Sequence, residues 1–237
     1  MRAPVLLLPS PLLPVSAYAG LASALERAGT EVDIAPVDGG PGLDPHALVR
    51  EWAGLVEPGT TLLAHSNAGY LAPATWAAAG SVGRDAGGVV FMDAALPPES
   101  GPAPLAPARF REHLAGLADD DGLLPPCTRW WPREAVAQVI PADRFPEIDR
   151  ECPRLPLSYL DTEMTPPSGW TAWPQAYLAF GSTYADELTA ARSRGWSHRA
   201  MPGGHLHFLV DPDEVARTVL GLRERLTGLA ARRPPGP

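Results

Sequence analysis

Residues 61–69 read TLLAHSNAG, an apolar run that leads into a serine turn and then into a helix-prone segment rich in alanine. A strand, a tight turn and a helix in this order push the Ser66 hydroxyl out at the carboxyl end of the strand. The backbone N–H groups after the serine and the helix N-terminus then face any negative charge that forms beside it. The stretch therefore predicts an α/β sheet that presents one nucleophile.

The turn departs from the usual pattern, which has glycine two residues before and two residues after the serine. Glycine is favoured there because the serine backbone is strained and the strand and helix approach closely. Here both positions are alanine, Ala64 and Ala68, and Gly69 follows directly. Serine is also favoured at ordinary helix N-caps, so the turn alone leaves open both a nucleophile and a plain cap.

Composition excludes several classes of function. The chain of 237 residues has 27 acidic and 19 basic residues, a net charge of −8, which gives no electrostatic footprint for nucleic acid. All basic residues are arginine, so Schiff-base chemistry, a pyridoxal-phosphate linkage and a P-loop lysine are excluded. We expect no metal, because the two cysteines, Cys127 and Cys152, lack metal-ligand spacing. We also expect no cofactor.

Location follows from similar arguments. Two cysteines are too few for a disulfide framework and fit a reduced cytoplasmic compartment. No run of about 18 apolar residues is present, so no membrane span is predicted. Residues 2–19 imitate a secretory leader, but prolines at positions 4, 9, 11 and 14 favour a strand at 5–8 followed by a functional loop.

Apolar strand candidates alternate with helical stretches, which is typical of a mostly parallel, doubly wound sheet covered on both faces. The expected strands are residues 4–8, 31–35, 60–64, 88–92, 176–180 and 196–201. The expected helices are residues 17–28, 45–56, 66–79, 184–194 and 213–229. The sequence predicts one domain, residues 1–237, whose core of residues 1–95 and 174–237 is interrupted by a cap insertion, residues 96–173.

The insertion is Pro-rich and holds four of the seven tryptophans, Trp130, Trp131, Trp170 and Trp173. A segment this long inside a compact domain is usually functional, commonly a lid. Its aromatic content favours a folded helical cap over a disordered insertion.

Three motifs together resemble the α/β-hydrolase superfamily. They are the serine turn, the run VVFMDAALP at residues 89–97 that leads into the cap, and the late segment GGHLHFLVDP at residues 203–212. Within that superfamily the chain is similar to small bacterial α/β hydrolases and, more loosely, to plant methylesterases and hydroxynitrile lyases. The resemblance covers nearly the whole chain except the cap, and it implies a core of about six strands without the N-terminal hairpin of larger members.

A serine hydroxyl attacks a carbonyl only if a base removes its proton, and histidine is suited to this near pH 7. We expect His205 to be this base, because it lies in a Gly-rich loop after a predicted strand, where the resemblance places the triad histidine. A buried loop histidine that bonds the backbone is the alternative. His207 is the second candidate, whereas His65, beside the nucleophile, is expected to pack or hydrogen-bond locally.

The base needs a carboxylate on its other nitrogen, and three residues compete for this role. Asp93 ends an apolar strand, where some lipase-like members hold the acid; a structural role at the entrance of the cap is its alternative. Family members usually carry the acid just after the penultimate strand, but the position three after Gly181 is Tyr184 and the carboxylates Asp186 and Glu187 come late. A helix N-terminus explains both of the latter. We rank Asp93 first, Asp186 second and Glu187 third.

An oxyanion hole also needs backbone donors. One is expected to be the N–H of Asn67, after the nucleophile, and the other to come from the loop after the first strand. There the matching position is Pro11, which has no N–H. Either Leu12 donates, or the Ser10 hydroxyl donates, or the site has one strong donor only.

These observations predict a serine esterase or thioesterase that cleaves an ester, lactone or thioester of a bulky apolar or aromatic small molecule through an acyl-enzyme. The alternative is a non-hydrolytic enzyme of the same fold, a cyclase, lyase or isomerase in specialised metabolism; a silent binding module comes third. The partner expected is a small-molecule substrate, and the sequence leaves the oligomeric state open. The expected substrate-binding residues are aromatic: Trp130, Trp131, Tyr159 and Phe110.

Overall fold

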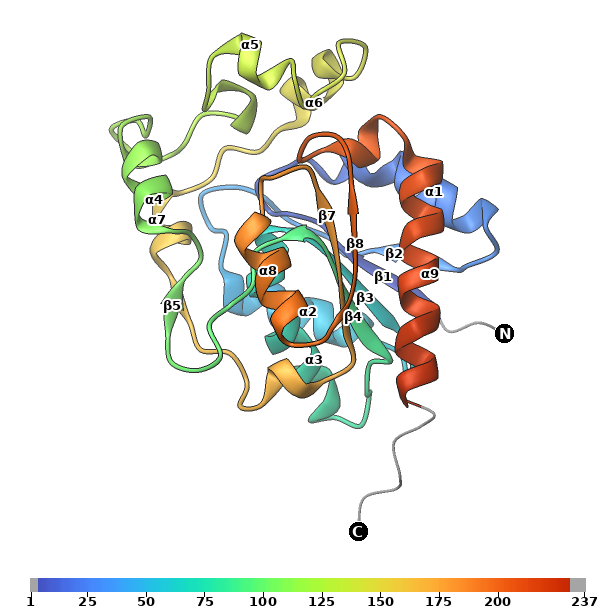
Figure 1. The fold of residues 1–237 in the computed structure, drawn as a ribbon. Helices are drawn as coiled ribbons and strands as arrows, with labels where there is room; N and C mark the ends of the chain where they lie inside the picture. Colours follow the sequence, from blue (N-terminus) through green and yellow to red (C-terminus); the bar gives the residue numbers. More distant parts are fainter. Residues whose placement is uncertain (1–3, 231–237) are drawn as a thin grey trace.

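The computed structural model describes residues 4–230, and its centre is a sheet of six parallel strands (Figure 1). In spatial order the strands are β2 (Val32–Ile34), β1 (Val5–Leu8), β3 (Thr61–Ser66), β4 (Gly88–Ala94), β7 (Gln175–Phe180) and β8 (Ser197–Met201). All six strands predicted from the sequence are confirmed. The winding direction reverses between β1 and β3, and open α/β sheets bind ligands at the carboxyl ends of strands at such a point.

Helices cover both faces of the sheet. One face packs against α1 (Ala19–Arg27) and α9 (Pro212–Ala230), and the other against α2 (Pro45–Leu55), α3 (Ala72–Gly80) and α8 (Ala185–Ser193). Short 3-10 turns, η1 (Val15–Tyr18), η2 (Asn67–Tyr70) and η5 (His207–Leu209), precede α1, α3 and α9. Among the described helices, none combines the length and apolar character needed to cross a membrane.

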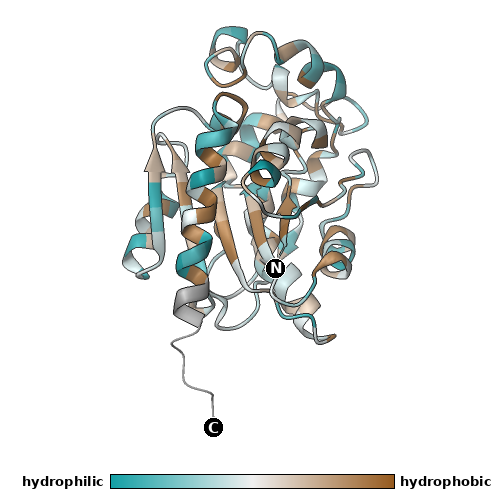
Figure 2. Cartoon of the chain, turned by 90° about the vertical axis from the view of Figure 1, so that its right-hand side faces the viewer, coloured by the Kyte–Doolittle hydropathy of each residue, from teal (hydrophilic) through white to brown (hydrophobic). Residues whose placement is uncertain are grey.

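The central strands are apolar throughout because successive side chains enter two different cores. In β1, Val5 and Leu7 pack towards α1 and α9, whereas Leu6 and Leu8 pack towards α2 and α3. The same alternation holds in β4 and β7. A parallel sheet buried on both faces requires this continuous hydrophobicity. Figure 2 shows the central strands largely in brown, behind a helix whose turns are both teal and brown.

An irregularity in β4 has consequences for the site. His65 of β3 pairs with Met92, but Ser66 pairs with Ala94, so Asp93 is an extra residue that has no partner in the ladder. Asp93 has a positive φ of 42°, rare for a residue other than glycine. The phenol of Tyr177 donates to the Ala94 carbonyl at 2.6 Å and accepts from its N–H at 3.2 Å, which satisfies backbone groups at the irregularity. Such a bulge redirects a side chain.

The serine turn is strained at Ser66, whose φ is 56° and ψ −124°. At Gly69, η2 comes close to the residue that follows β4, and a Cβ atom there would collide with the carbonyl oxygen of Ala95. Ala68 is fully buried. Glycine at position 69 therefore meets the steric requirement in this turn, and alanine is accommodated at position 68.

Between β4 and β7 the chain forms a segment that lies over the carboxyl ends of β1 and β3 (Figure 1). It contains α4 (Ala108–Ala115), η3 (Cys127–Arg129), α5 (Arg133–Val136), α6 (Phe145–Glu151), α7 (Leu157–Asp161) and η4 (Trp170–Ala172). A two-stranded antiparallel pair, β5 (Ala103–Pro104) with β6 (Glu163–Met164), was not expected from the sequence. We call this segment, residues 96–173, the cap; its limits as a domain stay a prediction.

Candidate active site

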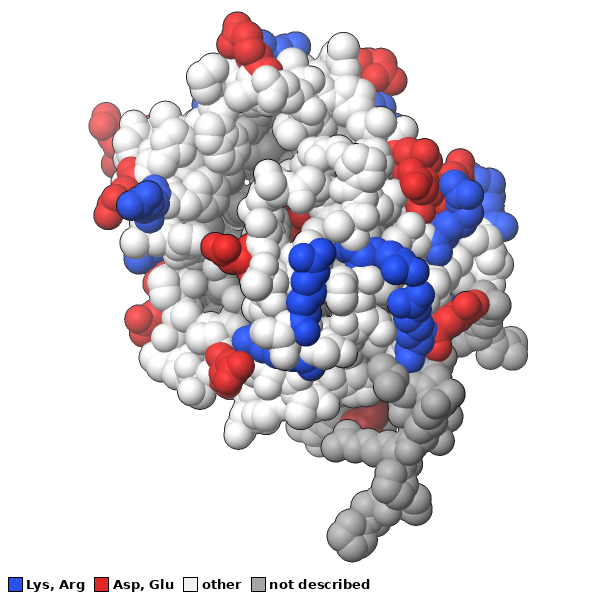
Figure 3. All heavy atoms as spheres, in the orientation of Figure 1, with Lys and Arg blue, Asp and Glu red and all other residues white. Residues whose placement is uncertain are grey.

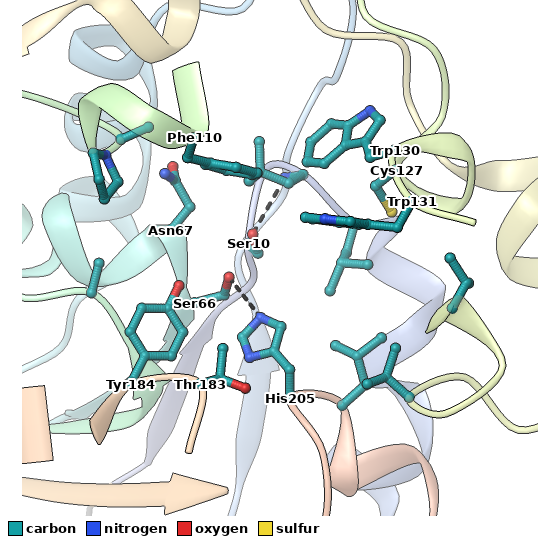
Figure 4. Close-up of a pocket in the computed structure, with 18 of the residues that line it drawn as sticks. Ser10, Ser66, Asn67, Phe110, Cys127, Trp130, Trp131, Thr183, Tyr184 and His205 are labelled. Carbon is teal, nitrogen blue, oxygen red and sulfur yellow. Dashed lines mark hydrogen bonds between the residues drawn. The ribbon is translucent and has the colours of Figure 1, made fainter. Parts of the chain in front are cut away.

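Three residues from distant parts of the chain form one hydrogen-bonded chain at the carboxyl edge of the sheet. Ser66 ends β3, Asp93 occupies the bulge of β4, and His205 lies in the loop between β8 and η5. The Ser66 hydroxyl lies 3.0 Å from His205 Nε2 (Figure 4), and His205 Nδ1 lies 2.7 Å from Asp93 Oδ2. The arrangement matches the geometry in which a base takes a serine proton while a carboxylate orients the base.

The environment of Asp93 favours one tautomer of His205. Asp93 is fully buried, and its second oxygen, Oδ1, accepts the N–H of Phe180 at 2.8 Å. An ionised carboxylate only accepts hydrogen bonds, so His205 carries its proton on Nδ1 and leaves Nε2 free to accept from Ser66. Neither of the other two candidate acids is hydrogen-bonded to His205 within the described chain: Asp186 is exposed in the first turn of α8, and Glu187, in the same turn, lines the cavity. His207, the second candidate base, packs against Phe180 instead.

Behind the site lies a second, buried hydrogen-bond network. The phenol of Tyr18 accepts the N–H of Ser10 at 2.8 Å and lies 2.8 Å from His65 Nδ1. His65 Nε2 lies 3.3 Å from the carbonyl of His205, and the two imidazole rings stack with centroids 4.7 Å apart. Tyr18 thus donates to Nδ1, and Nε2–H donates to the carbonyl. The network joins the loop after β1 to the loop that carries His205.

Burial lowers the pKa of His65 well below its usual range, and the neighbouring His205 lowers it further. His65 is therefore neutral, which suits its position, because a positive charge stacked on His205 would oppose protonation of that ring. The sequence assigned His65 to local packing or hydrogen bonding, which the structure shows, but Tyr18 was missed. No local signal marks it, because the contact spans 47 residues.

Tyr184 is a further residue that the sequence analysis did not assign to the site. Its ring lies 5.5 Å from the His205 ring, and it faces Ser66 (Figure 4). Burial raises the pKa of Tyr184, and a hydrogen bond with the Ser66 side chain offsets part of that rise. The phenol therefore stays protonated beside the candidate nucleophile. The sequence signal that could have placed Tyr184 in the site was its position three residues after Gly181, where family members were expected to carry the acid.

The loop after β1 supplies polar groups opposite Ser66. The Ser10 N–H is engaged by Tyr18, Pro11 has none, and the Leu12 N–H points to the Ser10 hydroxyl at a long 3.4 Å. Ser10 is buried in the protein, and its side chain lines the cavity (Figure 4). Asn67, directly after Ser66, is held by its side chain, which donates to the Leu105 carbonyl at 2.6 Å and accepts from Tyr159 at 2.7 Å.

A cavity of about 510 Å³ opens above Ser66 and His205. Its wall is mostly apolar, with Phe110, Trp130 and Trp131 contributed by the cap. Trp131 stacks on Phe110 and is 46% exposed, whereas Trp130 is buried and donates its indole N–H to Pro125. Figure 3 shows a hollow between cap and core whose visible rim is largely uncharged.

Tyr159 was expected among the lining residues, and this prediction is wrong. The side chain is fully buried outside the cavity lining, and its hydroxyl donates to the Asn67 amide oxygen. Two of the cap tryptophans also lie elsewhere. Trp170 is buried against Phe91 and Trp196, and Trp173 packs on Trp76 of α3. These two indoles attach the cap to the core.

Within residues 4–230 no group of three or more histidine, cysteine or acidic side chains is arranged to hold a metal ion. Within the described chain no arginine lines the cavity, and one carboxylate, Glu187, does. The absence of a cofactor stays a prediction.

Comparison with known proteins places the fold. No family model and no curated protein matches the sequence. Among solved structures, an extracellular α/β-hydrolase from a Paenibacillus species superposes with a TM-score of 0.73 at 14% identity, over 93% of this chain and 98% of that one. A pyrethroid hydrolase from Sphingobium faniae JZ-2 gives a TM-score of 0.67 at 18% identity, over 94% and 97%.

Tomato methylketone synthase I gives a TM-score of 0.67 at 9% identity, over 95% of this chain and 99% of that one. Together these similarities show that the chain has the α/β-hydrolase fold, as its three motifs predicted. The Paenibacillus protein is described as sharing homology with tobacco salicylic acid binding protein 2. The expected cytoplasmic location of this chain stays a prediction.

Proposed function

We propose that this protein is a serine hydrolase that cleaves an ester, lactone or thioester of a bulky apolar or aromatic small molecule. The observation that carries the proposal is the Ser66–His205–Asp93 chain of hydrogen bonds at the floor of an apolar cavity. The pyrethroid hydrolase and the α/β-hydrolase among the similar structures support the same class of reaction.

In the proposed reaction, His205 Nε2 takes the hydroxyl proton of Ser66 as its oxygen attacks the carbonyl carbon. The buried Asp93 carboxylate stabilises the imidazolium that forms. His205 then gives its proton to the leaving group, an acyl-enzyme remains on Ser66, and water activated by His205 releases the acid. The first proton transfer follows the existing 3.0 Å contact between the Ser66 hydroxyl and His205 Nε2, while the 2.7 Å contact with Asp93 keeps the ring oriented.

The negative oxygen of the tetrahedral intermediate needs donors. We assign one to the Asn67 N–H, which the hydrogen bonds to the Asn67 side chain hold in place. We assign the other to the Ser10 hydroxyl: its oxygen accepts the Leu12 N–H, so its own proton is available to the cavity. Rotation of the weakly held Leu12 N–H provides the alternative donor.

The test is hydrolysis of p-nitrophenyl esters with acyl groups of increasing size, together with labelling by a fluorophosphonate. We expect Ser66→Ala to lower kcat by about a thousandfold or more with an unchanged fold, because the nucleophile is lost. Ser193→Ala is the matched control, since Ser193 is an exposed serine whose hydroxyl bonds only within α8. Turnover by Ser66→Ala equal to that of the control would refute the proposal.

A further inference from the structure

The two cysteines of the chain lie together in the cap. Cys127 is the first residue of η3, Cys152 follows α6, and their sulfur atoms are 3.1 Å apart. The Cys127 N–H donates to the Cys152 sulfur at 3.2 Å. The chain contains no other cysteine, so a disulfide within one molecule has a single possible pairing.

We propose that Cys127 and Cys152 are a dithiol that closes reversibly to a disulfide and thereby fixes one wall of the cavity. The oxidant is a small-molecule disulfide. Cys127 lines the cavity, so its sulfur attacks one sulfur of the oxidant, and the first small thiol leaves with the Cys127 proton. The Cys152 sulfur then attacks the Cys127 sulfur, and the second small thiol leaves with the Cys152 proton.

The two sulfurs differ in acidity and in access to the cavity. The hydrogen bond between the thiols lowers the pKa of Cys152 and raises that of Cys127, and backbone N–H groups of Cys127 and Thr128 lower the pKa of Cys152 further. Cys152 is buried and the cavity reaches Cys127. Access to the cavity assigns the first attack to Cys127, although its raised pKa slows that step, and the more readily ionised Cys152 thiol resolves the mixed disulfide.

The bridge would close a loop whose side chains form much of the cavity wall. Residues 128–151 contribute Trp130, Trp131, Val136, Val139 and Ile140 to the lining. The Cys152 sulfur also lies 3.8 Å from the carbonyl of Leu12, in the loop opposite Ser66. Closing the bridge therefore restrains the cap wall where it meets the loop after β1. An effect of the bridge on substrate turnover rests on the proposed function, but formation of the bridge does not.

Bridge formation is tested by thiol counting. Full-length protein is equilibrated with oxidised glutathione or with reduced dithiothreitol, denatured and alkylated with iodoacetamide. We expect the wild type to take up two alkyl groups after reduction and none after oxidation, with no glutathione bound. Cys152→Ser should take up one alkyl group after reduction and carry a mixed disulfide with glutathione after oxidation. Alkylation of both cysteines in the oxidised wild type, or a mixed disulfide as its end product, would overturn the proposal.

Tryptic cleavage gives a second readout that does not depend on activity. Arg129, Arg133 and Arg150 are exposed between the two cysteines, so a cut at any of them places Cys127 and Cys152 on different fragments. On a non-reducing gel we expect the fragments of oxidised wild type to stay joined and those of Cys152→Ala to separate. Oxidised wild type should also melt about 5–15 °C above the reduced form, since closing a loop of this length restricts the unfolded chain. Separation of the wild-type fragments would contradict the bridge even if esterase activity were absent.

Discussion

Replacing Asp93 by asparagine tests the proposed triad at its most selective point. The buried carboxylate accepts from His205 Nδ1 at 2.7 Å and from the Phe180 N–H at 2.8 Å. An amide has one accepting oxygen and one donating nitrogen, so it satisfies only one of these two donors. We therefore expect Asp93→Asn to keep the fold and to disable the base.

In Asp93→Asn, the Phe180 N–H determines the orientation of the introduced side-chain amide. If the oxygen faces this N–H, the amide nitrogen donates to His205 Nδ1, and the ring proton moves to Nε2, opposite Ser66. The reverse orientation sets the amide nitrogen against a buried N–H, which costs about 1–3 kcal/mol. The inactive tautomer is thus favoured, and the imidazolium also loses its counter-ion. We expect kcat to fall about 10³–10⁴-fold, or about 4–5.5 kcal/mol of transition-state stabilisation.

The assay is steady-state hydrolysis of a p-nitrophenyl ester, with the melting temperature measured in parallel. Asp186→Asn is the matched control, because Asp186 is exposed in the first turn of α8 and should affect stability by less than about 1 kcal/mol. Ser66→Ala/Asp93→Asn should be no slower than Ser66→Ala alone, since the residues act as a unit. A loss below about tenfold in Asp93→Asn, or a larger loss in Asp186→Asn, would refute the reasoning.

Two further predictions concern the cavity and the buried histidine. Trp131→Ala should lower kcat/KM for bulky aryl esters with little change in melting temperature, because Trp131 lines the cavity. Trp170→Ala should lower the melting temperature by about 6–20 °C, because Trp170 is fully buried against the core. Equal melting temperatures of the two variants would contradict this division. His65 is neutral in the fold but ionises in the unfolded chain below its ordinary pKa of 6.5, so unfolding takes up a proton there. The wild type should therefore lose about 2 kcal/mol of stability between pH 7 and pH 5, and His65→Gln should lose less; identical pH profiles of unfolding free energy would rule this out.

The sequence by itself determined the features that depend on local patterns. Each central strand is an apolar run because both faces of the sheet are covered, so strand positions follow from composition along the chain. The serine turn is equally local, because Ser66 and Gly69 lie within one short stretch between β3 and α3. The late Gly-rich loop then placed His205 after the last strand.

Only the tertiary structure decided which carboxylate faces His205. Sequence reasoning ranked Asp93 ahead of Asp186, but the contact of Asp93 with His205 spans 112 residues and depends on a one-residue bulge in β4. The same holds for Tyr159, which was expected in the cavity and instead holds Asn67. Strand register and side-chain direction are set by packing between distant segments, and a shift of one residue turns a side chain to the other face. Local periodicity carries no information about such a shift.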